Sequence, residues 1–346
     1  MLQHEHILPL QAPCRPCALE RARDLKLHRV LVPLDGSEDA EQALPYAAMI
    51  AKWLDAELTL FNTVHPGPPF LYYREGQVRY PDQLQDRAEF LSNSYLSEVA
   101  KGLTEAGVKA RWGVASGDAA RLIAARAAGG EFGLIVMAVT VRSPLRRTLR
   151  PTVLEQFWRY TATPALIVKV RRRRKSVQTP LAPPELVVPL GGDSVSEEAG
   201  PYAAALAGAS GARVTLIAAQ VRRRRGLLDL YSGKPPDGKE SKAEVRIREV
   251  AARLMKDRLT VQAEARVGIP AHVVTSRNNE SQGSWVVMSS TMSSGIPRLL
   301  HGSTADGVLR NGRGPVLVVP SSVVAAKRAE VAPFLMQTRL RRAGVE

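Results

Sequence analysis

The chain has 346 residues, 45% of them hydrophobic and 23% charged, a composition typical of a globular protein long enough for two domains of roughly 140 residues. Its net charge of +15 favours attraction to polyanions such as RNA, DNA or an anionic membrane surface. No apolar run approaches the roughly 18 residues of a membrane-spanning helix, so we expect no membrane insertion.

Residues 1–25 have the composition of a flexible leader, which contains the C-x-x-C pair Cys14 and Cys17. A zinc site or a redox pair is one interpretation, and incidental thiols are the other. We favour incidental thiols and expect no metal, because the spacing matches no standard zinc pattern. So few cysteines fit a reducing compartment, and the N-terminus lacks a secretory signal, so we expect a cytoplasmic protein.

Strand-like and helix-like segments alternate after the leader. Short apolar runs predict strands, and apolar residues at helical spacing predict helices, the first of which has Ser37 available as its N-cap. The predicted strands are 28–33, 57–64, 109–114, 133–139 and 165–170, and the predicted helices are 40–54, 84–106, 117–128 and 152–160. A variable loop rich in Pro and Tyr is expected over 65–81.

The same order of segments occurs twice. The run VPLDGS at 32–37, followed by LPYAA at 44–48, matches VPLGGD at 188–193 and GPYAA at 200–204. The second copy is predicted to have strands over 186–189, 214–219, 260–266, 285–288 and 316–319. Alternating strands and helices form a parallel sheet with right-handed crossovers and helices on both faces.

The repeat divides the chain into domain 1 (26–170) and domain 2 (185–321), with a basic, Pro-rich linker over 171–184 and a basic tail over 322–346. The linker begins with Arg171–Lys175, and a second basic run, Arg222–Arg225, falls inside domain 2. Like charges repel and proline interrupts helices, so we expect the linker to be an exposed tether.

The segments VLVPLDGSEDAEQALPYAAMIA, GLIVMA and TPALIV resemble the universal stress protein family, and the second copy resembles a second such domain. The resemblance implies an α/β fold of two tandem, open, parallel five-stranded sheets with helices on both faces. This fold is Rossmann-like and similar to that of adenine nucleotide alpha hydrolases. The resemblance also implies a stress-response role, and it makes ATP a candidate ligand, because one subgroup of the family binds ATP and another does not.

The ATP-binding members share a loop G-x2-G-x9-G-[ST] after the fourth strand and an Asp that closes the first strand. Glycines let backbone N–H groups approach phosphates, and the Gly-[ST] pair opens a helix whose positive end faces them. Domain 1 keeps the acid as Asp35 and the hydroxyl as Thr152, but its three glycine positions hold Ala138, Val141 and Pro151.

Domain 2 has lost the other half of the pattern. Gly302 and Ser303 are retained and Gly295 adds flexibility, but Ser289 and Met292 replace the first two glycines. Gly191 replaces the acid, and Asp193 is a candidate substitute for it. The candidate nucleotide-binding residues are therefore Asp35, Thr152, Ser289, Gly295, Gly302 and Ser303.

No nucleophile elbow, Walker motif or zinc-peptidase motif is present, so we expect no enzymatic activity and no catalytic residues. The favoured function is a non-catalytic stress-response or regulatory protein with degenerate nucleotide sites and at most weak ATP binding in domain 2. The alternative is a basic adaptor that binds nucleic acid or an anionic membrane surface. We also expect the last strands of the two domains to pair within the chain, and a homo-oligomer is compatible with this pairing.

The adaptor hypothesis predicts the effect of replacing Arg171–Arg174 with Ser. Binding to any nucleic acid should weaken about equally, and its salt dependence should flatten, because fewer phosphate contacts release fewer counterions. Titration of RNA and DNA at several salt concentrations measures both effects. The hypothesis is wrong if the unaltered chain binds neither RNA nor DNA at low salt.

Overall fold

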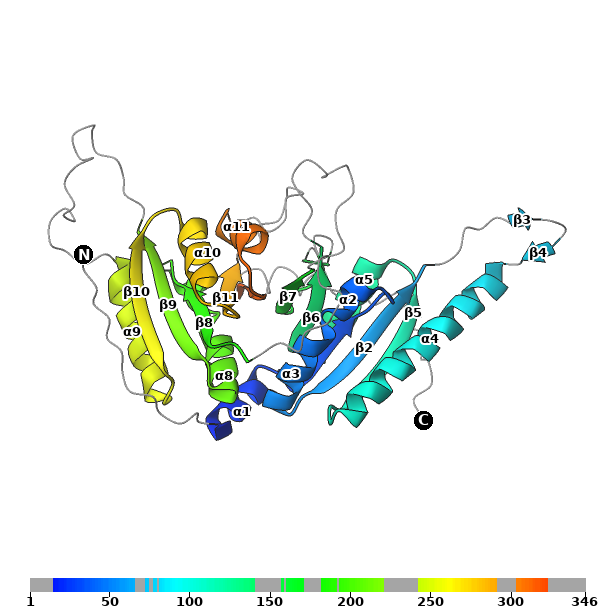
Figure 1. Cartoon of the computed structure of the whole chain (residues 1–346), viewed down its shortest axis with the longest axis horizontal. Coiled ribbons are helices and arrows are strands. Elements are labelled where there is room, and N and C mark those ends of the chain that lie inside the picture. Colours follow the sequence, from blue (N-terminus) through cyan, green and yellow to red (C-terminus); the bar gives the residue numbers. More distant parts are fainter. Residues whose placement is uncertain are drawn as a thin grey trace, which may run out of the picture. The chain divides into compact units, whose positions relative to one another are not determined.

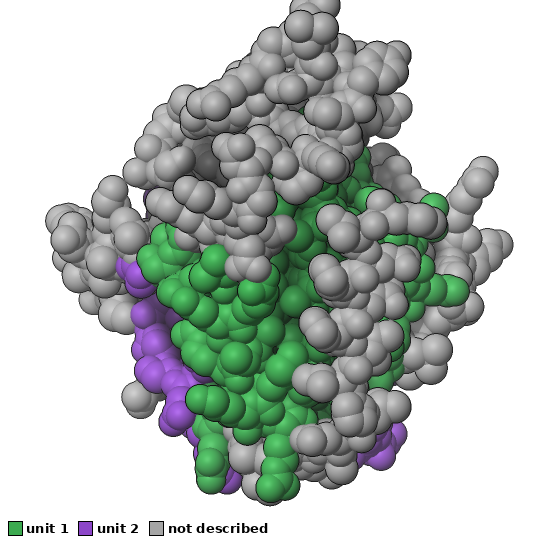
Figure 2. Space-filling model, turned by 90° about the vertical axis from the view of Figure 1, so that its left-hand side faces the viewer, with its two compact units in different colours: residues 1–21, 181–291, 300–319 green, residues 22–180, 292–299, 320–346 purple. Residues whose placement is uncertain are grey.

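The computed structural model describes residues 15–65, 72–74, 77–79, 81–140, 157–158, 160–170, 182–191, 193–220, 242–290 and 303–322. The chain divides into two compact units (Figure 2). One unit comprises residues 22–180, 292–299 and 320–346 and contains domain 1. The other comprises residues 1–21, 181–291 and 300–319 and contains nearly all of domain 2.

Domain 1 has a parallel five-stranded sheet in the order β7-β6-β1-β2-β5 (Figure 1). Its strands are β1 (Arg29–Pro33), β2 (Glu57–Val64), β5 (Ala110–Ser116), β6 (Leu134–Val139) and β7 (Ala165–Lys169). The central strands are almost wholly apolar and buried, as in β1, where Val30, Leu31 and Val32 are inaccessible to solvent. Such runs indicate a sheet that is covered on both faces.

The strand order determines which face of the sheet each helix of domain 1 covers. These helices are α2 (Glu38–Glu41), α3 (Leu44–Leu54), α4 (Pro81–Glu105) and α5 (Ala119–Ala128). The chain moves outward from β1 through β2 to β5 and then returns to β6 on the other side of β1. Because parallel crossovers are right-handed, α3 and α4 cover one face and α5 covers the other.

Domain 2 repeats this arrangement in the order β10-β9-β8-β11-β12. Its strands are β8 (Glu185–Pro189), β9 (Arg213–Gln220), β10 (Val261–Val267), β11 (Trp285–Ser290) and β12 (Val316–Pro320). Its helices are α7 (Ser194–Glu197), α8 (Gly200–Ser210), α9 (Lys242–Lys256), α10 (Pro270–Glu280) and α11 (Ser303–Asn311). The predicted fold class is confirmed in both copies.

Three segments differ from the sequence-based predictions. The helix expected over 40–54 is split into α2 and α3, because Pro45 lacks the N–H that a continuous helix would bond to residue 41, and it lies in the first turn of α3 instead. The loop expected over 65–81 contains an antiparallel ribbon of β3 (Tyr72–Arg74) and β4 (Gln77–Arg79). The leader expected to be flexible contains α1 (Arg15–Asp24), where Arg21 forms a 2.5 Å ion pair with Asp257.

The helix expected over 152–160 lies mostly outside the described residues, of which Phe157, Trp158 and Tyr160 are helical. Phe157 and Trp158 are buried, in agreement with a helix packed against the sheet. Within the described part of the chain, no helix is long and apolar enough to cross a membrane.

Glycine at position 133 is required by close packing, which predicts the effect of a substitution. A Cβ atom there would overlap the carbonyl oxygen of Leu25 and the backbone of Lys26. Gly133→Ala should therefore lower the free energy of unfolding by about 1–3 kcal/mol. Gly102→Ala is the matched control, because a Cβ at that position of α4 meets nothing within 4 Å.

The control should be neutral or stabilising by up to about 1 kcal/mol, since Ala favours helices more than Gly does. Urea denaturation followed by circular dichroism measures both variants. Equal midpoints for the two variants would contradict the packing argument.

Candidate functional site

The strand order locates the candidate site in each domain. β1 lies between β2 and β6, and β8 lies between β9 and β11, so the order reverses beside the first strand of each copy. Ligands of open α/β sheets bind outside the carboxyl ends of the strands at this reversal. The candidate sites are therefore the turn after β1 with the end of β6, and the turn after β8 with the end of β11.

In domain 1 the turn after β1 is held by the carboxylate of Asp35. Asp35 Oδ1 accepts hydrogen bonds from the backbone N of Ser37 at 3.0 Å and from its Oγ at 2.5 Å. Gly36, between them, has φ of +80°, which glycine adopts without strain. Ser37 Oγ in turn accepts from the backbone N of Ala40 at 3.1 Å, so the predicted N-cap role of Ser37 is confirmed, although the capped helix is the short α2.

Two further contacts attach α2 to its neighbours. Thr140 Oγ1, just after β6, donates to Asp39 Oδ2 at 3.4 Å. The hydroxyl of Tyr95 on α4 donates to Glu41 Oε1 at 2.8 Å. Sequence reasoning missed Tyr95 and Glu41, because nothing in the chain order indicates that residues 54 positions apart meet.

The turn after β1 is strongly acidic. Burial raises the pKa of Tyr95, and the hydrogen bond to Glu41 and the charges of Glu41 and Asp35 raise it further. The first turn of α2 contributes Glu38, Asp39 and Glu41 in addition to Asp35. Their charges oppose the approach of a polyphosphate.

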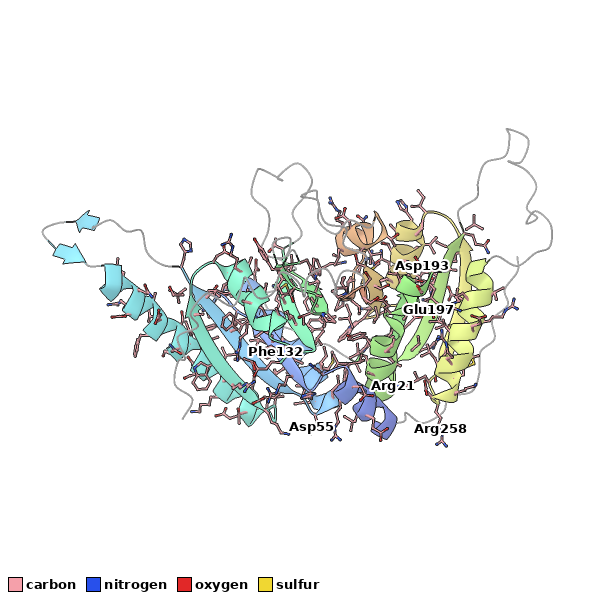
Figure 3. The ribbon with its side chains drawn as sticks, turned by 180° about the vertical axis from the view of Figure 1, so that it is seen from behind. Arg21, Asp55, Phe132, Asp193, Glu197 and Arg258 are labelled. Carbon is pink, nitrogen blue, oxygen red and sulfur yellow. The ribbon has the colours of Figure 1, made fainter. Side chains whose placement is uncertain are left out.

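The corresponding turn of domain 2 lacks the first acid and uses the second one for capping. Asp193 Oδ1 accepts from the backbone N of Ser196 at 2.9 Å and so caps α7 (Figure 3). This is the capping role of Ser37 in domain 1, 156 positions earlier. Asp193 therefore occupies the place of Ser37, and the residue in the place of Asp35 is Gly191.

In the repeat, Glu197 on α7 (Figure 3) is equivalent to Glu41 of domain 1. Likewise, Arg246 on α9 is equivalent to Tyr95. Arg246 Nε donates to Glu197 Oε1, and Arg253 Nη2 donates to Oε2 at 2.6 Å. Burial raises the pKa of Glu197, but the hydrogen bonds from Arg253 and Arg246 outweigh it and leave that pKa below its ordinary value. The arginines compensate the charge of Glu197, so the turn of domain 2 is less negative than that of domain 1.

The predicted site residues are distributed as follows. Asp35 is exposed at the turn of domain 1, Ser289 is half-buried near the end of β11, and Ser303 is the first residue of α11. Thr152, Gly295 and Gly302 lie outside the described residues. Among the residues that the structure describes, no group of three or more His, Cys, Asp or Glu side chains could hold a metal ion.

Each copy is thus an open parallel α/β domain of Rossmann type, and its candidate site lies where the strand order reverses. The family model described as "Universal stress protein family" matches residues 26–169 and 185–320. The chain belongs to the universal stress protein family and contains two of its domains in tandem. The resemblance noted from the sequence is therefore confirmed.

Individual relatives agree with this family. A universal stress protein of Methanocaldococcus jannaschii is 30% identical over 141 residues, which cover 41% of this chain and 81% of that protein. The structure of a universal stress protein from Archaeoglobus fulgidus superposes with a TM-score of 0.62 at 18% identity, covering 85% of this chain and 96% of that one. A putative universal stress protein from Pseudomonas aeruginosa gives a TM-score of 0.59 at 17% identity over 90% of this chain and 99% of that one. At these identities the two structures support the fold.

The environment of Tyr95 predicts its titration. Its phenol should remain protonated above the ordinary pKa of 10.0, and the free energy of unfolding should fall above that pH, because the unfolded chain ionises first. Tyrosinate absorbance during an alkaline titration should show that Tyr95→Phe removes a late-titrating phenol. Glu41→Gln should lower the pKa of Tyr95 only partly, because burial remains. An unchanged late phase in Tyr95→Phe would contradict this assignment.

Proposed function

We propose that this chain is a non-catalytic regulator of the stress response in which domain 2 binds an adenine nucleotide weakly and domain 1 does not. Family membership supports the stress-response role. The observation that carries the difference between the domains is the charge of the two equivalent turns. The turn of domain 1 contains Asp35, Glu38, Asp39 and Glu41, whereas in domain 2 two arginines compensate Glu197.

The geometry of domain 1 argues against a nucleotide there. Asp35, the acid that the family pattern assigns to the nucleoside, already accepts two hydrogen bonds from Ser37. Asp39, bonded to Thr140, lies between the turn and the end of β6, where a phosphate chain would have to pass. A nucleotide would therefore have to displace contacts that hold α2 in place.

Domain 2 is the better candidate because its turn has fewer obstacles. Gly191 contributes no side chain to the crevice, and the carboxylate of Asp193 is engaged in capping α7. The retained pair Gly302 and Ser303 matches the end of the family's phosphate loop. We expect weak binding, because Ser289 and Met292 stand where the pattern has glycines.

The adaptor alternative is supported by one observation, the net charge of +15. Its main elements, Arg171–Lys175, Arg222–Arg225 and the basic tail, lie outside the described residues. An ATPase is the weakest alternative, since the sequence offers no general base and no arrangement of carboxylates for magnesium.

Calorimetric titration of the full chain with ATP tests the proposal. Ser289→Gly combined with Met292→Gly should raise the affinity, because glycines readmit backbone N–H groups to the phosphates. Each charge-assisted bond contributes about 1.5–3 kcal/mol, so two or three of them change affinity by about a hundredfold or more. Asp35→Ala should change nothing measurable. Tight ATP binding that Asp35→Ala abolishes would show that domain 1 is the nucleotide site.

A further inference from the structure

A cluster of arginines lies at the amino ends of the strands of domain 1. The candidate nucleotide site lies at the opposite, carboxyl ends of these strands. Arg29 is the first residue of β1, Arg111 is the second residue of β5, and Arg126 lies near the end of α5. All three converge on Glu131, which precedes β6. Arg29 Nη1 lies 3.1 Å and Arg111 Nη2 3.7 Å from Glu131 Oε1, and Arg126 Nη2 lies 3.3 Å from Oε2.

Neutral groups orient two of these arginines without compensating their charge. Arg111 Nε donates to Thr59 Oγ1 at 3.0 Å, and the guanidinium of Arg126 lies 5.5 Å from the centroid of the Phe132 ring. The buried Nη2 of Arg111 has no hydrogen-bond acceptor. The cluster therefore has more donors than acceptors, and its donors are already positioned.

Two other charged groups border the cluster. Glu57 Oε2 lies 3.6 Å from Arg111 Nε, and the exposed Lys26 donates to the carbonyl oxygen of Gly130 at 3.1 Å. The cluster thus combines four cations with two carboxylates. The arginine side chains are 33–38% exposed, so solvent reaches part of each of them, although Nη2 of Arg111 itself is buried.

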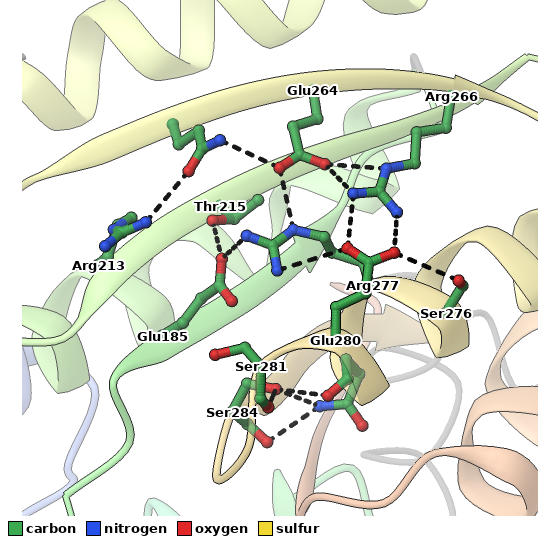
Figure 4. Close-up of polar contacts among 12 residues, drawn as sticks. Glu185, Arg213, Thr215, Glu264, Arg266, Ser276, Arg277, Glu280, Ser281 and Ser284 are labelled. Atoms are coloured by element: carbon green, nitrogen blue, oxygen red, sulfur yellow. Dashed lines mark hydrogen bonds and ion pairs between the residues drawn. The ribbon is translucent and has the colours of Figure 1, made fainter. Parts of the chain in front are cut away.

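The equivalent place in domain 2 serves as an internal comparison (Figure 4). Arg277 takes the position of Arg126, and Glu185 takes that of Arg29. Arg277 is bonded to Glu185 at 2.5 Å and to Glu264 at 2.9 Å, and it lies 4.0 Å from Glu280. Its side chain is only 10% exposed, so in domain 2 carboxylates enclose and neutralise the arginine.

We infer that the arginine cluster of domain 1 binds a phosphate group. Guanidinium groups present paired N–H donors that match phosphate oxygens, and three of them from separate elements can surround one anion. Glu131 is the resident anion of this site, and it competes with the ligand for the same donors. The site is separate from the candidate nucleotide site, and it does not depend on the function proposed above.

The test is equilibrium dialysis of the full chain with radiolabelled inorganic phosphate at constant ionic strength. The unaltered chain should bind phosphate saturably, and Arg111→Gln should weaken binding about tenfold, since one set of charge-assisted bonds is lost. Lys109→Gln is the matched control. It removes one positive charge just before the strand of Arg111, but Lys109 pairs with Asp55 and its side chain is 68% exposed. This control should bind as the unaltered chain does.

Glu131→Gln keeps the shape of the side chain and removes its charge, so it should bind phosphate more tightly. Such a gain cannot arise from misfolding. Competition with inorganic pyrophosphate and with a single-stranded oligonucleotide distinguishes a free phosphate ligand from a phosphodiester. The inference is overturned if the unaltered chain does not bind phosphate, if Arg111→Gln and Lys109→Gln lose affinity equally, or if Glu131→Gln gains none.

Discussion

Parallel pairing of the first strand on both of its sides is the constraint on which each domain depends. β1 is paired with β2 and β6, and β8 with β9 and β11, so the most apolar strands lie in the centre of each sheet. Right-handed crossovers then place helices on both faces, and the strand order reverses beside the first strand, where open α/β sheets bind ligands at the carboxyl ends of the strands. The turns after β1 and β8 lie at this reversal because they follow these strands directly.

Both domains have a side-chain contact between the long helix and the short helix, but the residue that makes it differs in charge. Tyr95 and Arg246 are equivalent, and each connects the long helix to an acid on the short helix, Glu41 or Glu197. A phenol leaves the carboxylate charged and uncompensated, whereas an arginine neutralises it. The same attachment therefore gives the two turns different electrostatic character, and the proposed difference in nucleotide binding between the domains rests on it.

The two domains also differ in their charged residues at the amino ends of the strands. In domain 2 Arg277 is almost buried and is paired with Glu185, Glu264 and Glu280, of which Glu185 is itself buried. Removing one partner of such a buried pair leaves an uncompensated charge and is strongly destabilising. In domain 1 the cluster around Glu131 is partly exposed to solvent, so its ion pairs contribute less to stability.

The order of strands and helices could be predicted from the sequence, because apolar periodicity and the internal repeat are local patterns. The strand at 57–64 has the predicted bounds, and the other strands of both sheets differ from the prediction by one or two residues. Asp35 could also be proposed from the sequence, since it closes the first strand. The roles of Tyr95, Arg246 and Asp193 could not, because each depends on which side chain meets it across the fold.

The sequence by itself thus determined the fold, the tandem organisation and the family of this protein, since these depend on patterns of neighbouring residues. The tertiary structure decided that Asp193 is a cap, that Glu41 and Glu197 lie in opposite electrostatic surroundings, and that Arg29, Arg111 and Arg126 converge on Glu131. These facts depend on distances between residues up to 102 positions apart in the chain, and such distances exist only once the sheet has formed.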